Sequence, residues 1–569
     1  MLELNHSSQL HSFSLVPDGT RSAPMAPDVM PSLPGLSIDE EFSPVEIPRV
    51  VENVFEEGGE FDPFDLSAGQ AISDDHTQST YIVRAKVAAN KLSALEKSAG
   101  TDGRIRAVYS DPEIEACDQA SPSPTADPAT SVPRICPGSP PLGSDRHVAA
   151  RLGVPWLRRR GMNGTGVYVA IVDSGINLAH LRARGLTAQL DVARSWMAHA
   201  GDQPGQLPVG HGTMCAYDAL IAAPRATLLD IALLRSTRPG GSAMAGLLSD
   251  AVRAYVHLFR LMRGPRRPGE ARSLVVNNSW GMFHPSWDFP VGHAGRYMDN
   301  PRHPFNIIVG VLAHAGADIV FAAGNCGRDC PDGRCRGVTN GGIYGANSHS
   351  QVLSVAGVDL LKRRVGYSNS GPGNLMHLKP DICGYTHFRG SGVYPADGGT
   401  SAAAPVVAGL VAALRSRFPY DPNDYRTSPA AMRNLITRTA EDRGAIGFDY
   451  HYGWGIANGR RMALLRSMSV LSSADEPAAD INEFSAAERA LESIDGLDEV
   501  PRRWHEETVG APVDQTKRSE PISASEPIEV RPPDTIRAPT SAMGDSTLPP
   551  PEDKRTRRAR TKSGDSMPA

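Results

Sequence analysis

The chain lacks a segment long enough to cross a membrane. Its best candidate, residues 402–414, contains a proline and a glycine and falls short of the roughly 18 apolar residues that a spanning helix requires. The first residues lack the basic start and the apolar core of a secretory signal peptide. We therefore expect a cytoplasmic protein without a membrane partner, and a non-standard export route stays open as the alternative.

No charge of one sign dominates the sequence. Its 58 Lys and Arg residues and 63 Asp and Glu residues leave a formal net charge of −5, and both signs are mixed along most of the chain. This balance gives no reason to expect nucleic acid as the main partner. The basic run within residues 551–569 is typical of a solvated, flexible tail, and docking to an acidic partner is the alternative.

Cysteine is scarce, and its count is odd. Seven cysteines form no even framework, which favours a reducing compartment over a secreted, disulfide-bonded scaffold. Three of them, Cys326, Cys330 and Cys335, cluster in one loop. Free thiols are the simplest interpretation of this loop. A zinc ion with a fourth ligand from elsewhere, or one disulfide beside a redox-sensitive thiol, are the alternatives.

Composition divides the chain into five parts. Residues 1–75 and 471–569 are rich in Pro, Ser and acidic residues, and we predict that both are disordered. Residues 117–149 are rich in Pro, Ser and Thr and are predicted to form an accessible linker. Residues 76–116 are predicted to form a small α+β piece, which precedes the largest part at 150–470. The elements expected in the small piece are a strand at 80–85, a short helix after Asn90 and a strand at 104–109.

Residues 150–470 alternate between apolar runs and helical patterns. The runs VYVAIVD, ATLLDIALL, SLVVNNSWG, ADIVFAAGN and QVLSVAGVD are each typical of a strand that is buried on both faces. Helical patterns, including 244–262 and 401–418, lie between them. This alternation predicts an α/β fold with a doubly wound, mostly parallel sheet and helices on both faces.

Three short segments carry an acid, a base and a hydroxyl group in that order. Asp173 ends the run VYVAIVD, and an α/β sheet places its ligand site at the carboxyl ends of its strands. His211 lies between Gly210 and Gly212, which let the backbone pack closely beside the ring. Ser401 opens a predicted helix, where the helix dipole favours a developing oxyanion. Singly, these residues could be a turn, a structural histidine and an incidental serine, but together they indicate nucleophilic catalysis.

The segments IVDSGIN, GHGTMC and GGTSAAAPVVAG resemble the catalytic motifs of the subtilisin-like serine proteases, the subtilases. The order Asp, His, Ser matches that family and argues against the order Ser, Asp, His of the α/β-hydrolases. The resemblance covers roughly residues 150–470 and implies a serine endopeptidase that works through an acyl-enzyme intermediate. In that family Ser401 would attack the scissile carbonyl, His211 would transfer the proton and Asp173 would orient His211.

The same resemblance implies which residues bind the substrate. Asn325, in the segment AGN, corresponds to the oxyanion-hole asparagine. Ser279, Trp280 and Gly281 correspond to the segment that pairs with an extended substrate backbone. Trp280 would then line a pocket for apolar or aromatic side chains, and packing in the core is the alternative. Departures from the family pattern concern packing or substrate contacts, so we expect an altered pocket edge with activity retained: Met214, Cys215 and Ala402.

Residues 76–116 resemble an abbreviated inhibitory prodomain. If they are one, the protein should cut itself within residues 117–150; a permanent structural extension is the alternative. The resemblance implies a protein or peptide substrate, and it leaves the substrate's identity and the oligomeric state open. No cofactor is expected. Subtilases often bind structural calcium, but the resemblance assigns no carboxylate of this chain to such a site.

Two other functions stay open. A binding scaffold built on an inactive protease would need a lost triad residue, and none is lost. A peptide ligase of the same fold would share the acyl-enzyme intermediate but pass it to an amine. Product analysis with an added amine separates ligation from hydrolysis.

Overall fold

The computed structural model describes residues 1–5, 36–39, 41–48, 50–51, 71–72, 80–99, 105–117, 135–236, 242–264 and 273–471. The chain divides into two compact units, Met1–Ala478 and Ala479–Ala569. The predicted tail after residue 471 and most of the predicted linker lie outside the described residues. No helix in the described part of the chain is both long enough and apolar enough to cross a membrane.

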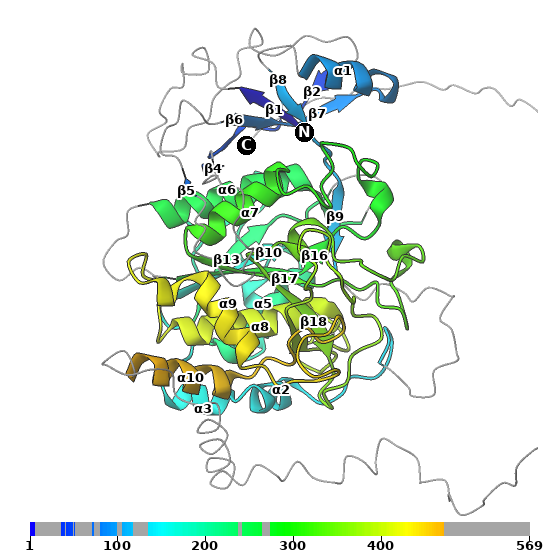
Figure 1. The fold of residues 1–569 in the computed structure, drawn as a ribbon. Helices are drawn as coiled ribbons and strands as arrows, with labels where there is room; N and C mark the ends of the chain where they lie inside the picture. The colour runs from blue at the N-terminus through cyan, green and yellow to red at the C-terminus, as the bar shows by residue number, and fades with distance from the viewer. Residues whose placement is uncertain are drawn as a thin grey trace, which may run out of the picture. The chain divides into compact units, whose positions relative to one another are not determined.

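An eight-stranded sheet forms the centre of the first unit (Figure 1). All of its strand pairs are parallel, which confirms the predicted doubly wound α/β fold. The strand order is β11 (Gln189–Leu190), β13 (Thr227–Ala232), β10 (Val167–Asp173), β15 (Ser273–Asn278), β17 (Ala317–Ala322), β18 (Leu353–Val358) and β19 (Ile382–Tyr385), with β12 (Trp196–Met197) paired to β13.

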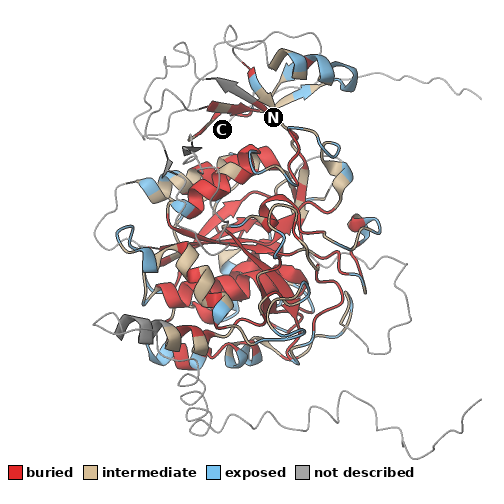
Figure 2. Ribbon diagram, in the orientation of Figure 1, coloured by how far each residue is buried: buried red, intermediate tan, exposed pale blue. Residues whose placement is uncertain are grey.

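Helices cover both faces of the sheet, because its strands are apolar on both sides. Along β10, Val169 and Ile171 pack on one side of the sheet, and Ala170 and Val172 pack on the other. Figure 2 shows the resulting buried layers. Helices α5 (His211–Ala222) and α8 (Gly399–Arg415) pack on the first side, and α6 (Leu248–Arg263) and α7 (Pro304–His314) pack on the second. Further helices around the central sheet are α2 (Asp145–Arg151), α3 (Val154–Arg159), α4 (Leu178–Ala183), α9 (Pro429–Arg438) and α10 (Gly459–Leu471).

Helices α5 and α8 approach each other closely, and they carry two of the predicted site residues at their first turns. Every residue of α8 is buried. A Cβ atom at Gly409 would lie 2.0 Å from the carbonyl oxygen of Ala219 on α5, so only glycine fits there. This contact holds the amino ends of the two helices at the same edge of the sheet.

The N-terminal residues form a separate small sheet. Its order is β3 (Val45–Ile47), β6 (Thr80–Val83), β1 (Leu2–Asn5) and β8 (Ile105–Val108), and its pairs with β1 are antiparallel. The predicted strand, helix and strand of residues 76–116 are present as β6, α1 (Leu92–Ala99) and β8. Further short pairs are β2 (Leu36–Ile38) with β7 (Ala85–Val87) and β4 (Val50–Val51) with β5 (Ala71–Ile72).

The structure differs from the sequence prediction within residues 1–75. That region was predicted to lack regular structure, yet β1 is a central strand of the small sheet. The physical reason is long-range pairing, since Leu2 lies opposite Val83 on one neighbour and Val108 on the other. Leu2 and Val83 are buried together with Leu95 of α1.

The small sheet contacts helix α6 through a cluster of charges. Arg84 forms an ion pair with Asp250, with Nη2 and Oδ2 2.6 Å apart, and Asp111 accepts from the main-chain N–H and the hydroxyl of Ser249 at 2.8 and 2.7 Å. After this contact the chain continues as β9 (Glu113–Ala116), which no longer belongs to the small sheet. It lies between β14 (Ala245–Leu247) and β16 (Trp280–Gly281) and is antiparallel to both. Residues 113–117 therefore run across the carboxyl edge of the central sheet.

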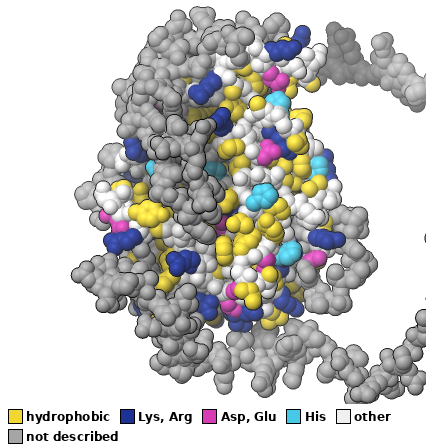
Figure 3. Space-filling view, in the orientation of Figure 1, with side chains coloured by type: hydrophobic (Ala, Val, Ile, Leu, Met, Phe, Trp, Pro, Cys, Tyr) yellow, Lys and Arg dark blue, Asp and Glu magenta, His cyan; other side chains and the backbone are white. Residues whose placement is uncertain are grey.

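The described surface mixes charges of both signs. On the face drawn in Figure 3, basic and acidic side chains are interspersed around an area of hydrophobic side chains. This pattern agrees with the mixed charge along the sequence.

Candidate active site

Asp173 and His211 form a buried pair. Asp173 is the last residue of β10 and His211 the first residue of α5. The Nδ1 atom of His211 lies 2.9 and 3.0 Å from the two carboxylate oxygens, and both side chains are fully buried. Such a contact keeps the proton on Nδ1, so that Nε2 can act as a base.

Two glycines bring this pair together. A Cβ atom at Gly212 would lie 2.5 Å from the carbonyl oxygen of Gly175, so the first turn of α5 packs directly on the backbone that follows Asp173. Gly175 itself has a φ of +103°, a conformation that favours glycine. The motifs around Asp173 and His211 are thus complementary in shape as well as in chemistry.

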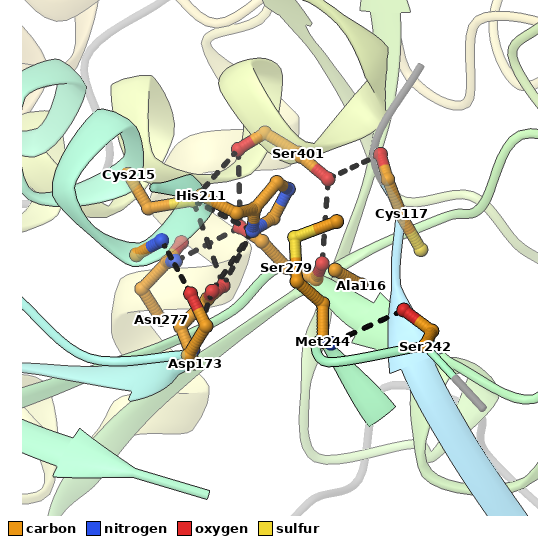
Figure 4. Close-up of polar contacts among 12 residues, drawn as sticks. Ala116, Cys117, Asp173, His211, Cys215, Ser242, Met244, Asn277, Ser279 and Ser401 are labelled. Carbon is orange, nitrogen blue, oxygen red and sulfur yellow. Dashed lines mark hydrogen bonds and ion pairs between the residues drawn. The ribbon is translucent and has the colours of Figure 1, made fainter. Parts of the chain in front are cut away.

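Ser401 lies at the start of α8, in its first turn. Its hydroxyl contacts the carbonyl oxygen of Cys117 and lies 3.3 Å from that of Ser279. Its own carbonyl accepts from the hydroxyl of Ser279 at 3.0 Å. Figure 4 shows the side chains of Asp173, His211 and Ser401 converging, with Cys117 beside Ser401. The structure therefore gathers the predicted acid, base and hydroxyl residues at one point.

Asn325 completes this arrangement from the end of β17. Its Nδ2 atom donates to the carbonyl oxygen of Cys117 at 2.7 Å. Its Oδ1 atom accepts from the main-chain N–H and the hydroxyl of Thr400, both at 2.9 Å. Because Thr400 supplies donors to the oxygen, the amide orientation is determined by its partners. The NH₂ group must then face Cys117.

Residues 113–117 occupy the cleft in an extended conformation. The N–H of Cys117 donates to the carbonyl of Ser279 at 2.8 Å, and the N–H of Ala116 donates to that of Met244 at 3.1 Å. Trp280 and Gly281 pair with Ala116 and Glu115. The segment Ser279–Gly281, which was predicted to pair with an extended substrate, thus pairs with an extended segment of its own chain.

The predicted pocket role of the Trp280 side chain is wrong. The ring is fully buried, and it packs edge-on against Phe321 with centroids 5.3 Å apart and lies 5.7 Å from Phe305. The main chain of Trp280 pairs with Ala116 of that segment. The alternative from the sequence, packing in the core, describes this side chain. The reason is strand alternation, which places the ring on the buried face covered by α7.

The cysteines of the loop after Asn325 are disulfide-bonded, so the free-thiol interpretation is wrong. Cys326 pairs with Cys335, and Cys330 pairs with Cys136. Because these pairs engage all three loop thiols, the zinc alternative does not hold either. Cys136 lies 194 residues before its partner, and nothing in the local spacing indicated this pairing.

Sequence reasoning also missed a set of buried acids beside the site. When Asp218 on α5 and its neighbour Asp397 are both ionised, neither carboxylate oxygen of Asp218 has a hydrogen-bond donor among the described residues. Burial, followed by the charge of Asp397, raises the pKa of Asp218 well above its usual range, so it can stay protonated and donate to Asp397. Burial also raises the pKa of Asp397 to about 6 and that of Asp230 to about 7.

One group of side chains in the described ranges has the spacing of metal ligands. It consists of Asp173, His211 and Cys215, whose ligand atoms lie within 4.8 Å of one another. These residues do not fit calcium, which takes six to eight oxygen ligands. Burial and the charge of Asp173 raise the pKa of the Cys215 thiol well above its usual range, so this sulfur is also a poor metal ligand. The group is an Asp–His pair with a neutral thiol beside it.

A buried Asp–His pair, a serine at a helix start and an amide donor beside it define a serine hydrolase with a triad. The model of the subtilase family matches residues 164–455, and the chain belongs to this family. It is 25% identical over 316 residues to subtilisin DY of Bacillus licheniformis, covering 54% of this chain and 96% of that protein. It is 24% identical to subtilisin E of Bacillus subtilis and 25% identical to subtilisin Savinase of Lederbergia lenta, with 54% of this chain covered in both cases and 68% and 95% of those proteins. The protein is a subtilisin-like serine endopeptidase, a hydrolase.

Proposed function

We propose that Ser401 is the nucleophile, His211 the general base and acid, and Asp173 the residue that orients His211. The Ser401 hydroxyl oxygen attacks the scissile carbonyl carbon while its proton passes to Nε2 of His211. The carbon–nitrogen bond then breaks, and the leaving amine takes that proton. Water hydrolyses the resulting ester and restores Ser401. Asn325 holds the negative oxygen of the tetrahedral intermediate.

We further propose that the first bond cut is the chain's own Cys117–Asp118 bond. One observation carries this proposal: the carbonyl oxygen of Cys117 accepts from Asn325 at 2.7 Å and contacts the Ser401 hydroxyl. That is the position that a scissile carbonyl must take. The backbone pairing of residues 113–117 on both sides holds the bond there. The products are a segment that ends in the Cys117 carboxylate and an enzyme that begins at Asp118.

Residues before the cut would remain as an inhibitory prodomain. Strand β9 fills the substrate position between β14 and β16, and Arg84 and Asp111 anchor the small sheet to α6. None of these contacts depends on an intact Cys117–Asp118 bond. The free segment would therefore keep blocking the cleft until it is removed or degraded.

Intact mass and N-terminal sequencing test both proposals. Purified wild type and Ser401→Ala are incubated and treated with a serine-directed fluorophosphonate. We expect wild type to yield a new N-terminus at Asp118 and to take the label, and Ser401→Ala to stay full length and unlabelled. Wild type that hydrolyses peptides yet stays full length would refute self-cleavage alone. Wild type that neither cleaves nor takes the label would refute the assigned roles.

The disulfides bear on where the protein works. Two such bonds, Cys136–Cys330 and Cys326–Cys335, form and persist in oxidising compartments. We propose such a compartment in place of the cytoplasmic location favoured by the odd cysteine count. Mass analysis of the protein from its native source after thiol blocking tests this: both bonds should be found closed.

A further inference from the structure

Glu115 is the third residue before the Cys117–Asp118 bond, counting Cys117 as the first. Its neighbours Ile114 and Ala116 are fully buried, whereas Glu115 points to the other side of the strand. Its carboxylate nevertheless meets a cation there, because the Nη1 atom of Arg334 lies 2.7 Å from its Oε2 atom. Only 13% of the Glu115 side chain is exposed. The side chain thus lies in a partly closed subsite beside the Arg334 guanidinium.

Arg334 is held in place before it meets Glu115. The two oxygens of Asp332 accept from its Nε and Nη2 atoms at 2.9 and 2.8 Å. The guanidinium carbon also lies 3.7 Å from the centre of the Phe283 ring, a cation–π contact that fixes the plane of the group. These contacts engage one edge and one face of the guanidinium, and its Nη1 atom faces residues 113–117. It donates to Glu115 and also to the carbonyl of Ala116, at 3.0 Å.

The loop that carries Arg334 is itself closed covalently. Arg334 belongs to a 3₁₀ turn, Gly333–Cys335, and Cys335 is bonded to Cys326, the residue after Asn325. The N–H of Asp332 donates to the carbonyl of Asn325 at 3.0 Å. The cation that meets Glu115 and the amide that meets the Cys117 carbonyl therefore lie on one cross-linked loop. Their spacing is set by that loop whichever chain fills the cleft.

We infer that Arg334 makes the cleft selective for an acidic side chain at the third residue before the cleaved bond. This inference rests on the proposed cleavage after Cys117. The substrates it assigns are extended protein segments with Glu at that position, a buried aliphatic residue before it, and small residues at the two positions before the cut. Ile114, Glu115, Ala116 and Cys117 are the example in the chain itself. A lysine at the third position would bring a second cation to Arg334 in place of the carboxylate that pairs with it, and it would be disfavoured.

Fluorogenic peptides with the sequence acetyl-Ile-Xaa-Ala-Ala test this selectivity on the self-processed enzyme after its cleaved N-terminal segment has been removed. The Xaa residue is Glu, Gln or Lys, and Ala replaces Cys at the last position to avoid thiol oxidation. We expect kcat/KM for Glu to exceed that for Gln by roughly tenfold, the effect of one charge-assisted hydrogen bond. The Lys peptide should be the poorest substrate, and the Glu preference should shrink as salt is added.

Two variants assign the preference to one residue. In Arg334→Met the ratio of Glu to Gln should fall to about one, while the Glu and Gln peptides slow because the contact with the Ala116 carbonyl is lost and the Lys peptide loses its disadvantage. Arg336→Met removes an equal charge two residues further on, from a side chain that reaches Ser286 at 3.5 Å, and it should keep the wild-type ratio. Fluorophosphonate labelling shows whether each variant is folded and competent.

The outcomes separate the two proposals. An enzyme that takes the label and cleaves Glu and Gln peptides equally overturns the selectivity and leaves the proposed function standing. A preference for Glu that persists in Arg334→Met overturns the role of Arg334. If that variant does not take the label, the wild-type series of Glu, Gln and Lys still decides the selectivity. Wild type that neither takes the label nor cleaves any peptide overturns the proposed function and this inference with it.

Discussion

The side-chain amide of Asn325 donates to the carbonyl oxygen of Cys117 at 2.7 Å, across 208 residues of sequence. The Ser401 hydroxyl contacts the same oxygen. The amide that we propose as the oxyanion donor is thus already engaged by a carbonyl of its own chain. Removing this amide gives the most direct test of the proposed chemistry.

Asn325→Ala should slow self-cleavage and peptide hydrolysis by about 10²–10³-fold in kcat, with little change in KM, the size found for this group in subtilisin, a relative of this protein. The donor contributes most when the oxygen carries the negative charge of the transition state, whereas ground-state binding is dominated by the paired strands and persists. Steady-state kinetics on a peptide substrate measure the split. Asn325→Asp, which keeps the shape but has no N–H to donate when ionised, should be impaired as well. A rise in KM with unchanged kcat would contradict the oxyanion role.

The Cys136–Cys330 bond should contribute more to stability than the Cys326–Cys335 bond. The first closes a loop of 194 residues and the second a loop of nine, and the chain-entropy model makes the longer cross-link the more stabilising. Replacing Cys136 and Cys330 together by serine should lower the free energy of unfolding by about 2–4 kcal/mol. Urea unfolding under non-reducing conditions, in a Ser401→Ala background, measures both paired variants. An equal or larger loss for the short loop would contradict the prediction.

Asp218→Asn should stabilise the protein at alkaline pH. Burial raises the pKa of Asp218 well above its usual range and that of Asp397 to about 6, whereas the ordinary value for an aspartate is 3.8. At a pH between the ordinary pKa and the raised pKa of these two carboxyls, the folded protein therefore binds more protons than the unfolded chain. The stability that this pair contributes falls as pH rises through about 6 and beyond. The asparagine of the variant still donates a hydrogen bond to Asp397, and it has no carboxyl group that could ionise. We expect its free energy of unfolding to exceed that of the parent by about 1–3 kcal/mol at pH 8.

The pH dependence is the internal control of that experiment. Below about pH 4 the parent's Asp218 is protonated and donates as the amide does, so the two proteins should converge there. Thermal unfolding at pH 4, 6 and 8, again in a Ser401→Ala background, follows the difference. A constant difference at every pH would show that the substitution acts through packing and not through ionisation.

The central fold and the three motif residues could be predicted from the sequence alone. The runs that became β10, β15 and β17 are apolar on both faces, and this property is local, so it can be read without knowing any partner strand. Asp173, His211 and Ser401 were recognisable because each is embedded in a short glycine- or alanine-rich frame of its own. Their chain order then distinguished one class of serine hydrolase from another.

Contacts between residues far apart in the sequence became known only from the folded structure. The pairing of Cys136 with Cys330, the strand formed by Leu2–Asn5 and the burial of the Trp280 ring all depend on partners far away in sequence. The same holds for Glu115 and Arg334, which are 219 residues apart. Local composition cannot encode such contacts, because each is stabilised by the geometry of the folded sheet edge and not by its own neighbours. At that edge the segment 113–117 meets the Asn325 amide and the Arg334 guanidinium.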